Sequence, residues 1–455
     1  TYSDPDIAYD YGAGYASDAD GDGRSATEEG FSRALAAQLD ALHAALDCDC
    51  APGAGGFTVS GFTNLELVYL GSTGAGDLRV ANTSDASTAY AYFPGDGVGG
   101  DIWLGARTRA PQAGNYGNDA ILHELGHALG LKHPHEAEGG FGALPKAYDS
   151  PEFTVMTYRS YVGASTKTGY LFEDWGAPQS YMMLDIAALQ ALYGADFSPN
   201  SGNTTYRWTP LSGQTLVDGK VGIDPGENRI FATIWDGGGK DTYDLSAYGN
   251  DLCLDLRPGK GSVFADAQLA DLGGGPNGGH ARASIFNALQ YQGDARSLIE
   301  NACGGRGDDS LMGNAANNRL VGGAGEDDLR GLAGRDVLVG GKGDDRFVFV
   351  KVSESRPGAC DRLEADSRAI AFDDPGSRDG DRIDLRGIDA DTTRAGDQAF
   401  AFGAGHGRGH LWLEETEKVT YVCGNVDGDA AAELQLAIVD GVTRAAAYGA
   451  DDFLL

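Results

Sequence analysis

Residues 304–348 read GGRGDDSLM, GNAANNRLV, GGAGEDDLR, GLAGRDVLV and GGKGDDRFV, five consecutive units of nine residues without an insertion. The first position of every unit is glycine, and the eighth is always large and apolar. The apolar residues are Leu311, Leu320, Leu329, Leu338 and Phe347. A flexible linker rich in glycine and aspartate would not keep an apolar residue at every ninth position. The repeat therefore predicts a parallel β-roll, in which each unit forms a turn and a short strand, and alternate units stack along opposite edges.

The turn of each unit offers oxygen atoms to a metal ion. Its sixth position is aspartate or asparagine, and hard oxygen atoms are the ligands that calcium prefers. Glycines in the turn permit backbone angles that are closed to other residues. The predicted calcium-binding residues are Gly305, Gly307, Asp309, Asn318, Gly323, Gly325, Asp327, Gly334, Asp336, Gly341, Gly343 and Asp345. The second unit, with Asn314, Ala316 and Asn318, and the fourth, with Leu332, depart from the ideal, and we expect weaker binding there.

The composition is consistent with calcium binding and excludes several other classes. The chain has 67 acidic and 34 basic residues, a formal net charge of −33, and 70 of its 455 residues are glycine. Nucleic acids and anionic membranes are bound by clustered lysine and arginine, so we expect neither partner. No apolar run approaches the roughly 18 residues of a membrane helix. The start, TYSDPDIAYDYG, has no basic and apolar signal-peptide regions, so we expect export, if any, by another route.

The chain before the repeats has a different texture. Apolar spacing predicts an amphipathic helix over 27–46, and residues 57–104 contain strand-like stretches broken by turn residues. A second helix is expected from Asn118 to Gly130, and the apolar stretch 181–194 also ends at a glycine. We therefore predict an α+β domain over 1–200, an all-β calcium-binding β-roll domain over 201–355 and a C-terminal β-rich region over 356–455.

The run HELGHALGLKH, residues 123–133, carries the chemistry. His123 and His127 are four residues apart and project from one helical face, and Gly130 lets the chain turn so that His133 supplies a third zinc ligand. Three neutral imidazoles leave room for water, and Glu124 is placed to take its proton. The alternative, surface histidines on an ordinary helix, does not account for the spacing. The pattern predicts a hydrolytic zinc site.

The same run, followed 23 residues after His133 by Met156 in TVMTY, resembles the metzincin pattern with its Met-turn. With the calcium repeats, it is similar to the serralysin-type secreted bacterial metalloproteases. GDIWL, MMLDIAALQALYG, IWDGGGKDTYDLSAY, IENACGG and the ending DDFLL extend the similarity over nearly the whole chain. The resemblance implies a metzincin-like catalytic domain, a zinc endopeptidase activity on proteins or peptides, and type I export with a C-terminal signal.

The resemblance also implies roles for individual residues. Tyr158 would be an additional zinc ligand that moves off when substrate binds and then stabilises the oxyanion, and Met156 would form an apolar floor beneath the metal. The strand around Ile102 and Trp103 is the expected edge for pairing with an extended peptide, although an edge without a ligand role is an alternative. Further calcium ligands would be Asp236, Gly238, Gly239, Asp241 and Glu300. A proteinaceous protease inhibitor is a candidate partner, and a monomer is expected.

Other features lie outside the family pattern. DADGDGRSATEE fits a calcium loop at Asp18, Asp20, Asp22 and Glu29, with a solvated acidic turn as the alternative. NVDGDAAAE repeats this pattern more weakly at Asn425, Asp427 and Asp429. The remaining histidines, His43, His135, His280, His406 and His410, lack ligand spacing, and His43 is expected to be structural. The family usually lacks cysteine, whereas this chain has six, and an oxidising exterior suggests bridges 253–303, 360–423 and 48–50.

A second function class fits the repeats. The chain could be a calcium-binding surface or adhesion protein whose protease-like domain has lost activity. Glu124 and the three histidines are all intact, which favours the zinc endopeptidase.

Overall fold

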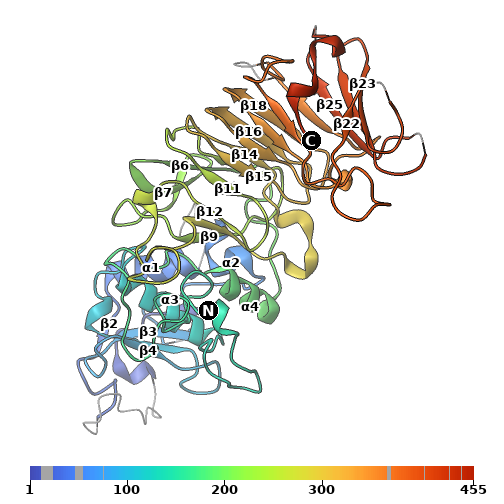
Figure 1. The fold of residues 1–455 in the computed structure, drawn as a ribbon. Helices are drawn as coiled ribbons and strands as arrows, with labels where there is room; N and C mark the ends of the chain where they lie inside the picture. Colours follow the sequence, from blue (N-terminus) through green and yellow to red (C-terminus); the bar gives the residue numbers. More distant parts are fainter. Residues whose placement is uncertain are drawn as a thin grey trace. The chain divides into compact units, whose positions relative to one another are not determined.

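The computed structural model describes residues 1–11, 24–46, 55–74, 76–365, 370–403, 405–429, 431–441 and 443–455 (Figure 1). The chain divides into two compact units. The first contains Thr1–Gly239 and Asp266–Ser297, and the second contains Lys240–Ala265 and Leu298–Leu455. In the part of the chain that the structure describes, no helix is long and apolar enough to cross a membrane.

A small mixed sheet forms one layer of the first unit. Its strands lie in the order β1-β3-β5-β4, and β2 also pairs with β3. They are β1 (Tyr2–Ser3), β2 (Ser32–Arg33), β3 (Leu78–Asn82), β4 (Ala89–Ala91) and β5 (Asp101–Leu104). The prediction that the strand of Ile102 and Trp103 is an edge is wrong, because β5 lies between β3 and β4 and both side chains are fully buried. The strand at the edge beyond β5 is β4, which pairs with β5 in antiparallel orientation.

The first unit also contains the α-helices of the described residues. They are α1 (Ala36–Leu46), α2 (Val59–Phe62), α3 (Tyr116–Ala128) and α4 (Met183–Tyr193). The helix expected over 27–46 begins only at Ala36, because Ser32 and Arg33 pair with β3 instead. The strand expected around FTVSGF is instead the short helix α2, which is capped by Thr58. Helix α3 starts two residues before Asn118, and its N-cap is Asn115, whose side chain accepts the Asn118 N–H.

The same unit continues beyond residue 200 with short strands. They are β6 (Thr205–Thr209), β7 (Ser212–Val217), β8 (Lys220–Ile223), β9 (Ala232–Ile234) and β13 (Ile285–Asn287). The first three form an antiparallel meander, and β13 pairs with β9 in parallel. One apolar core joins the sheet, α3 and α4 through fully buried side chains such as Val80, Leu125 and Ile186. This core holds α3 in place, which carries the motif of residues 123–133.

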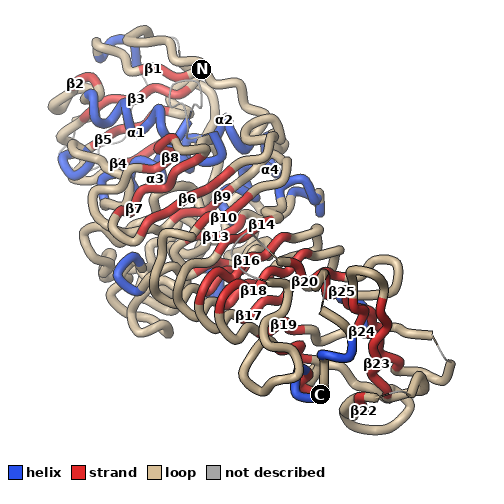
Figure 2. The backbone as a smooth tube through the Cα atoms, turned by 90° about the horizontal axis from the view of Figure 1, so that it is seen from above, coloured by secondary structure: helices blue, strands red, loops and turns tan. Residues whose placement is uncertain are grey.

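Two parallel stacks form the second unit, as the alternation of repeats predicted (Figure 2). One stack contains β11 (Cys253–Asp255), β15 (Ser310–Met312), β17 (Asp328–Arg330), β19 (Arg346–Val348), β21 (Arg382–Asp384) and β26 (Phe453–Leu454). The other contains β10 (Thr242–Asp244), β14 (Asn301–Cys303), β16 (Arg319–Ala324), β18 (Val337–Lys342) and β20 (Asp361–Glu364). All five apolar residues at position eight are at most 1% exposed.

The second stack ends in strands that lie outside the repeat. Strand β25 (Leu434–Val439) pairs with β20 in parallel. Strand β24 (Thr420–Asn425) then pairs with β25, and β23 (His410–Glu415) with β24, both in antiparallel orientation. Strand β22 (Ala401–Phe402) pairs with β23. The short strand β12 (Gly261–Ser262) follows β11 in the chain. The described residues after 355 therefore contain several strands.

Carboxylates at position six form a ladder through each stack. One oxygen of Asp327 accepts the backbone N–H of Asp309 at 2.8 Å, and Asp345 accepts that of Asp327 at 3.0 Å. On the other edge Asp336 accepts the N–H of Asn318 at 2.8 Å. The second oxygen of Asp327, of Asp336 and of Asp345 is buried without a hydrogen-bond partner. Burial raises the pKa of these carboxyls to about 7, 6 and 8, respectively.

The glycine at position one of a repeat leaves space for a carboxylate of the ladder. The glycines at positions two and four, such as Gly323 and Gly325, have φ values of 126° and 129°, as turns closed to other residues require. Gly322 at position one has no such φ, but a Cβ there would lie 2.2 Å from the Asp327 Oδ2 atom. The position stays glycine because the carboxylate occupies that space.

The ladder is longer than the perfect repeats. Asp361 accepts the N–H of Asp336 at 2.8 Å, and Asp381 accepts that of Asp345 at 2.9 Å. The residues before Asp361 and Asp381 do not follow the glycine pattern of the repeat, so these two carboxylates were not predicted from the sequence. An aspartate two residues before a strand's apolar residue, in DRLE and DRID, was the available signal. In the second nine-residue repeat, position six is Asn318, whose side-chain amide donates to the Glu300 carbonyl at 3.0 Å. An amide therefore takes the place of a carboxylate there.

The cysteine bridges expected in this unit are wrong. Cys253, Cys303, Cys360 and Cys423 are all free thiols. Cys253 lies on β11 and Cys303 on β14, which belong to different stacks, and Gln435 on β25 pairs with Cys423 across the sheet. Cys48 and Cys50 lie outside the described residues, and their link stays a prediction.

We predict that Gly322→Ala destabilises the second unit by about 1–3 kcal/mol, because the added methyl group must displace the Asp327 carboxylate. Gly249→Ala is the matched control, since a Cβ there meets nothing within 4 Å. The measurement is the urea midpoint of the full chain with calcium present. Equal midpoints for the two variants would contradict a steric role for the position-one glycine.

Candidate metal centre

Three imidazoles converge at the end of α3. The Nε2 atom of His133 lies 3.2 Å from that of His123 and 2.9 Å from that of His127. These three residues form a group whose ligand atoms lie within 4.8 Å of one another. His123 and His127 are buried, and His133 is partly buried. The sequence prediction that these three side chains meet is therefore confirmed.

The outer nitrogen of each ring is held by an oxygen acceptor. Nδ1 of His123 donates to the Val155 carbonyl at 2.9 Å, and Nδ1 of His127 donates to the Leu131 carbonyl at 2.7 Å. Nδ1 of His133 donates to the Glu136 carboxylate at 2.8 Å. Burial lowers the pKa of His123 to about 3 and that of His127 to about 4. With the proton on Nδ1, each neutral ring presents an Nε2 lone pair to a common point, which fits a divalent cation.

Two glycines shape the motif. Gly130 has a φ of 98°, so the chain leaves α3 and returns with His133, as predicted. Gly126 lies between the two helical histidines, and a Cβ there would lie 2.4 Å from the Met156 sulfur. Met156 is 2% exposed and packs directly against the helix. Met156 can therefore pack this closely against α3 only because residue 126 has no side chain, and the role of Gly126 was not predicted from the sequence.

A buried carboxylate fixes the Met156 turn. Asp185 on α4 accepts the Thr154 hydroxyl at 2.5 Å and the Val155 N–H at 2.8 Å. It also accepts the Met182 N–H at 3.0 Å. Because Val155 in turn orients His123, Asp185 positions a candidate metal ligand through one intermediate. An acidic residue inside the apolar run MMLDIAAL was the signal that could have identified it.

Glu124 and Tyr158 flank the histidines from different elements. Burial raises the pKa of Glu124 to about 8, partly opposed by a backbone hydrogen bond from Ala91 on β4. The Tyr158 ring lies 4.3 Å from the His133 ring and 5.5 Å from the His123 ring, centroid to centroid. Burial, with the charges of Glu124 and Glu136, raises the pKa of Tyr158 to about 12. The tyrosine is therefore a neutral phenol, 38% exposed, beside the histidines.

A cavity of about 510 Å³ opens beside these groups. His123, Glu124 and Tyr158 line one part of it, and Thr88 and Ala89 bring the edge strand β4 to its wall. Asp119, one helical turn before His123, lines its interior. Burial and the nearby charge of Asp185 raise the pKa of Asp119 to about 8. Neither β4 nor Asp119 was assigned a role from the sequence.

The other predicted calcium residues are placed as follows. Asp236 accepts the Tyr206 hydroxyl at 2.7 Å and the Gly238 N–H at 2.7 Å, and Gly238 and Gly239 have φ values near 135°. In the second unit Glu300 accepts the Asp241 N–H at 2.9 Å. Glu300 directly precedes β14 as Asp336 directly precedes β18, so it extends the carboxylate ladder.

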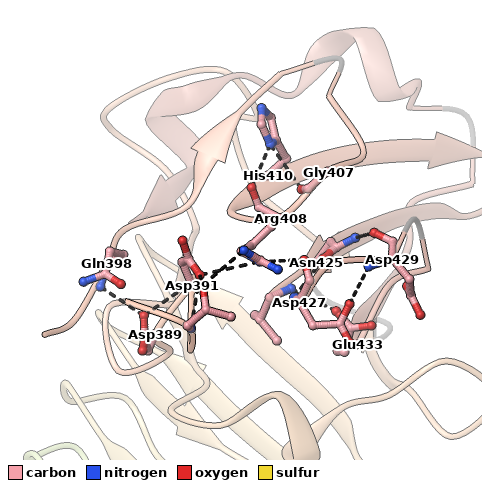
Figure 3. Close-up of polar contacts among 12 residues, drawn as sticks. Asp389, Asp391, Gln398, Gly407, Arg408, His410, Asn425, Asp427, Asp429 and Glu433 are labelled. Atoms are coloured by element: carbon pink, nitrogen blue, oxygen red, sulfur yellow. Dashed lines mark hydrogen bonds and ion pairs between the residues drawn. The ribbon is translucent and has the colours of Figure 1, made fainter. Parts of the chain in front are cut away.

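The two additional acidic loops have different outcomes. Asp427, Asp429 and Glu433 offer oxygen atoms within 4.8 Å of one another, while Arg408 donates to the Asp427 carbonyl at 2.9 Å (Figure 3). Calcium binding at this loop stays a prediction. Asp18, Asp20 and Asp22 lie outside the described residues.

The remaining histidines are placed as follows. His43 is structural as expected, since its Nδ1 contacts the Tyr2 hydroxyl at 2.6 Å. His135 lies closer to the site than its spacing suggested, 5.5 Å from the His133 ring.

Comparisons with known proteins agree with this geometry. The family model described as the serralysin C terminal of peptidase M10 matches residues 201–449. The metallopeptidase AprA of Pseudomonas marginalis is 35% identical over 383 residues, 78% of this chain and 72% of the relative. Serralysin A of Dickeya chrysanthemi is 35% identical over 364 residues, 79% and 68% of the two chains.

A solved structure is similar over a shorter part. The AlgE6R3 subunit of the Azotobacter vinelandii mannuronan C5-epimerase is 26% identical, and the match covers 34% of this chain and 77% of that one with a TM-score of 0.25. The family match and the relatives, which extend over most of the chain, are specific. With its three converging histidines, the chain belongs to the serralysin family of metallopeptidases.

Proposed function

We propose that this metallopeptidase is a zinc-dependent endopeptidase. The single observation that carries the proposal is the convergence of three Nε2 atoms whose partner nitrogens all donate to oxygen acceptors. Three imidazoles suit zinc, and catalytic zinc sites use three protein ligands with an open position. When bound, zinc supplies the Lewis acidity that activates water and polarises a carbonyl.

The residues around the histidines would then do the following work. Glu124 takes the proton of the attacking water and delivers it to the leaving amine. The edge strand β4 pairs with the extended substrate backbone, because no further strand of the small sheet pairs with its outer side among the described residues. Asp185, Glu136 and the Leu131 carbonyl hold the imidazoles in place, so little reorganisation is needed.

Tyr158 is assigned two successive roles. Its phenol would help to hold zinc when no substrate is bound, and would donate a hydrogen bond to the oxyanion when one is. Support for this assignment comes from the ring's position against His133 and its raised pKa, which keeps the hydroxyl proton available for donation.

The second unit is proposed to bind calcium through its carboxylate ladder. Buried carboxylate oxygens without donors, as on Asp327, Asp336 and Asp345, are satisfied by a hard cation. Binding would neutralise their mutual repulsion, so binding free energy becomes folding free energy. We propose that the β-roll domain, residues 201–355, stays unfolded in calcium-poor cytosol and folds outside the cell. Export would use a type I system that recognises a signal within residues 356–455.

Partners and domains follow from the same proposal. As a peptidase, the protein acts on protein substrates. We further propose, from the family, that residues 1–200 form the catalytic domain, that a proteinaceous inhibitor binds the enzyme, and that the protein is a monomer. The competing function, an adhesion module with an inactive protease-like domain, requires a defect at the histidines or Glu124, and none is present.

We predict that the enzyme hydrolyses casein, loses activity with 1,10-phenanthroline and regains it with added zinc. Glu124→Ala should lower kcat/KM by about 10²–10⁴-fold while zinc content stays at one ion, because the base is lost and the imidazoles remain. Metal analysis and a casein assay measure this. Near-normal turnover by Glu124→Ala would contradict the role of Glu124 as the base. An inactive wild type with bound zinc would favour the adhesion module.

Tyr158→Phe should reduce kcat more than it changes KM, because its hydroxyl acts mainly in the transition state. Steady-state kinetics on one quenched peptide measure both constants. Tyr161→Phe is the matched control, since this tyrosine follows in the same loop but does not line the cavity with His123. An effect of Tyr158→Phe confined to KM contradicts the assigned role.

Without calcium, the second unit should be more stable at pH 5 than at pH 7.5. Its ladder carboxyls have raised pKa values, about 6 for Asp336 and about 8 for Asp361, against 3.8 for an ordinary aspartate. Between about pH 4 and 8 the folded state therefore binds more protons than the unfolded chain, and stability falls as pH rises.

Circular dichroism of the full chain during urea unfolding measures this difference in calcium-free buffer. Added calcium should raise the urea midpoint more at pH 7.5 than at pH 5, because the ion competes with protons for the same oxygen atoms. A strand signal that is complete at pH 7.5 without calcium contradicts calcium-dependent folding.

A further inference from the structure

Asp119 is buried in the wall of the cavity beside the histidines. It lies in the first turn of α3, one turn before His123, and the residue is only 3% exposed. The same cavity is lined by His123, Glu124 and Tyr158. A group bound against Asp119 would therefore lie next to the bond that the site cleaves.

The Asp119 carboxyl group differs from the other buried carboxyls of this unit. Among the described residues, no hydrogen bond or ion pair reaches it. Asp185 accepts three hydrogen bonds, and Asp149 accepts those of Thr157 and Arg159 at 2.6 Å each. The Asp119 carboxyl group therefore makes no hydrogen bond that stabilises the fold, and its hydrogen-bonding capacity is available to a group in the cavity that it lines.

Aromatic and acidic side chains make up much of the remaining cavity wall. The rings of Tyr116 and Tyr170 lie 6.0 Å apart, and Tyr170 stacks on Phe172 at 4.8 Å. Such walls suit the aliphatic stem of a long side chain whose charged head reaches further in. Asp174 adds an exposed carboxylate to the lining. The basic residue of the lining, Arg107, is exposed and lies over the Tyr116 ring at 5.7 Å.

We propose that this cavity binds the side chain of a lysine or arginine residue flanking the scissile bond, and that Asp119 is the residue that selects it. The inference rests on the proposed peptidase function and names its substrate class. A guanidinium or ammonium group donates several hydrogen bonds and brings the positive charge that the buried carboxyl group lacks. An acidic substrate residue would meet Asp119 and Asp174 and be rejected.

The test uses the zinc-loaded full-length enzyme and quenched peptides that differ only in one residue on either side of the cleaved bond. Arginine, lysine, norleucine and glutamate are compared, with mass spectrometry to locate cleavage. At one of the two positions, wild type should cleave the basic peptides at least about tenfold faster than the norleucine peptide. Asp119→Asn should lower the ratio of kcat/KM for arginine over norleucine by about 10–100-fold, the effect of losing a charged hydrogen bond.

Asp6→Asn is the matched control, because the same change at an exposed carboxylate that does not line this cavity should leave the ratio within about twofold. If Asp119→Asn does not fold, the wild-type ratio and the binding of the arginine and norleucine peptides to Glu124→Ala, read by fluorescence anisotropy, decide the matter. Equal ratios in wild type and Asp119→Asn, or no basic preference in either measurement, overturn the inference. Cleavage of no peptide at all would instead count against the proposed peptidase function.

Discussion

Buried acceptors without donors are the constraint on which both units depend. In the first unit, three Nε2 atoms face one another because each Nδ1 is committed to an oxygen acceptor. In the second, stacked carboxylates use one oxygen on a backbone N–H and keep the other buried without a partner. Both arrangements concentrate negative potential at a point that a cation can occupy, and they differ in the ligand that they offer.

Each of these acceptors is positioned by neighbouring residues that would not themselves bind the cation. Asp185 holds the turn whose Val155 carbonyl orients His123, and Gly126 admits the Met156 sulfur against α3. In the β-roll, Gly322 leaves the space that the Asp327 carboxylate fills. The two units therefore use glycine for the same purpose, which is to let a heavy atom approach the backbone closely.

Membership of the serralysin family accounts for the common features and sharpens the individual ones. The cavity beside the histidines combines the edge strand β4, the phenol of Tyr158 and the buried carboxyl group of Asp119. Edge strands bind peptide backbones with little regard to sequence, so selectivity must come from side-chain pockets such as this one. Free cysteines on different stacks show that the β-roll holds together without disulfides among the described residues.

The sequence alone determined what depends on fixed spacing. The nine-residue period predicts alternate stacking, because each unit advances the chain by half a turn of the roll and residues 18 apart pair. HELGHALGLKH predicts converging imidazoles, because four residues span about one helical turn. Only the tertiary structure decided which strand is an edge, where Asp185 and Asp119 lie, and that Asp361 and Asp381 extend the ladder. These features depend on contacts between residues far apart in the chain, and a local pattern carries no information about its partner across the fold.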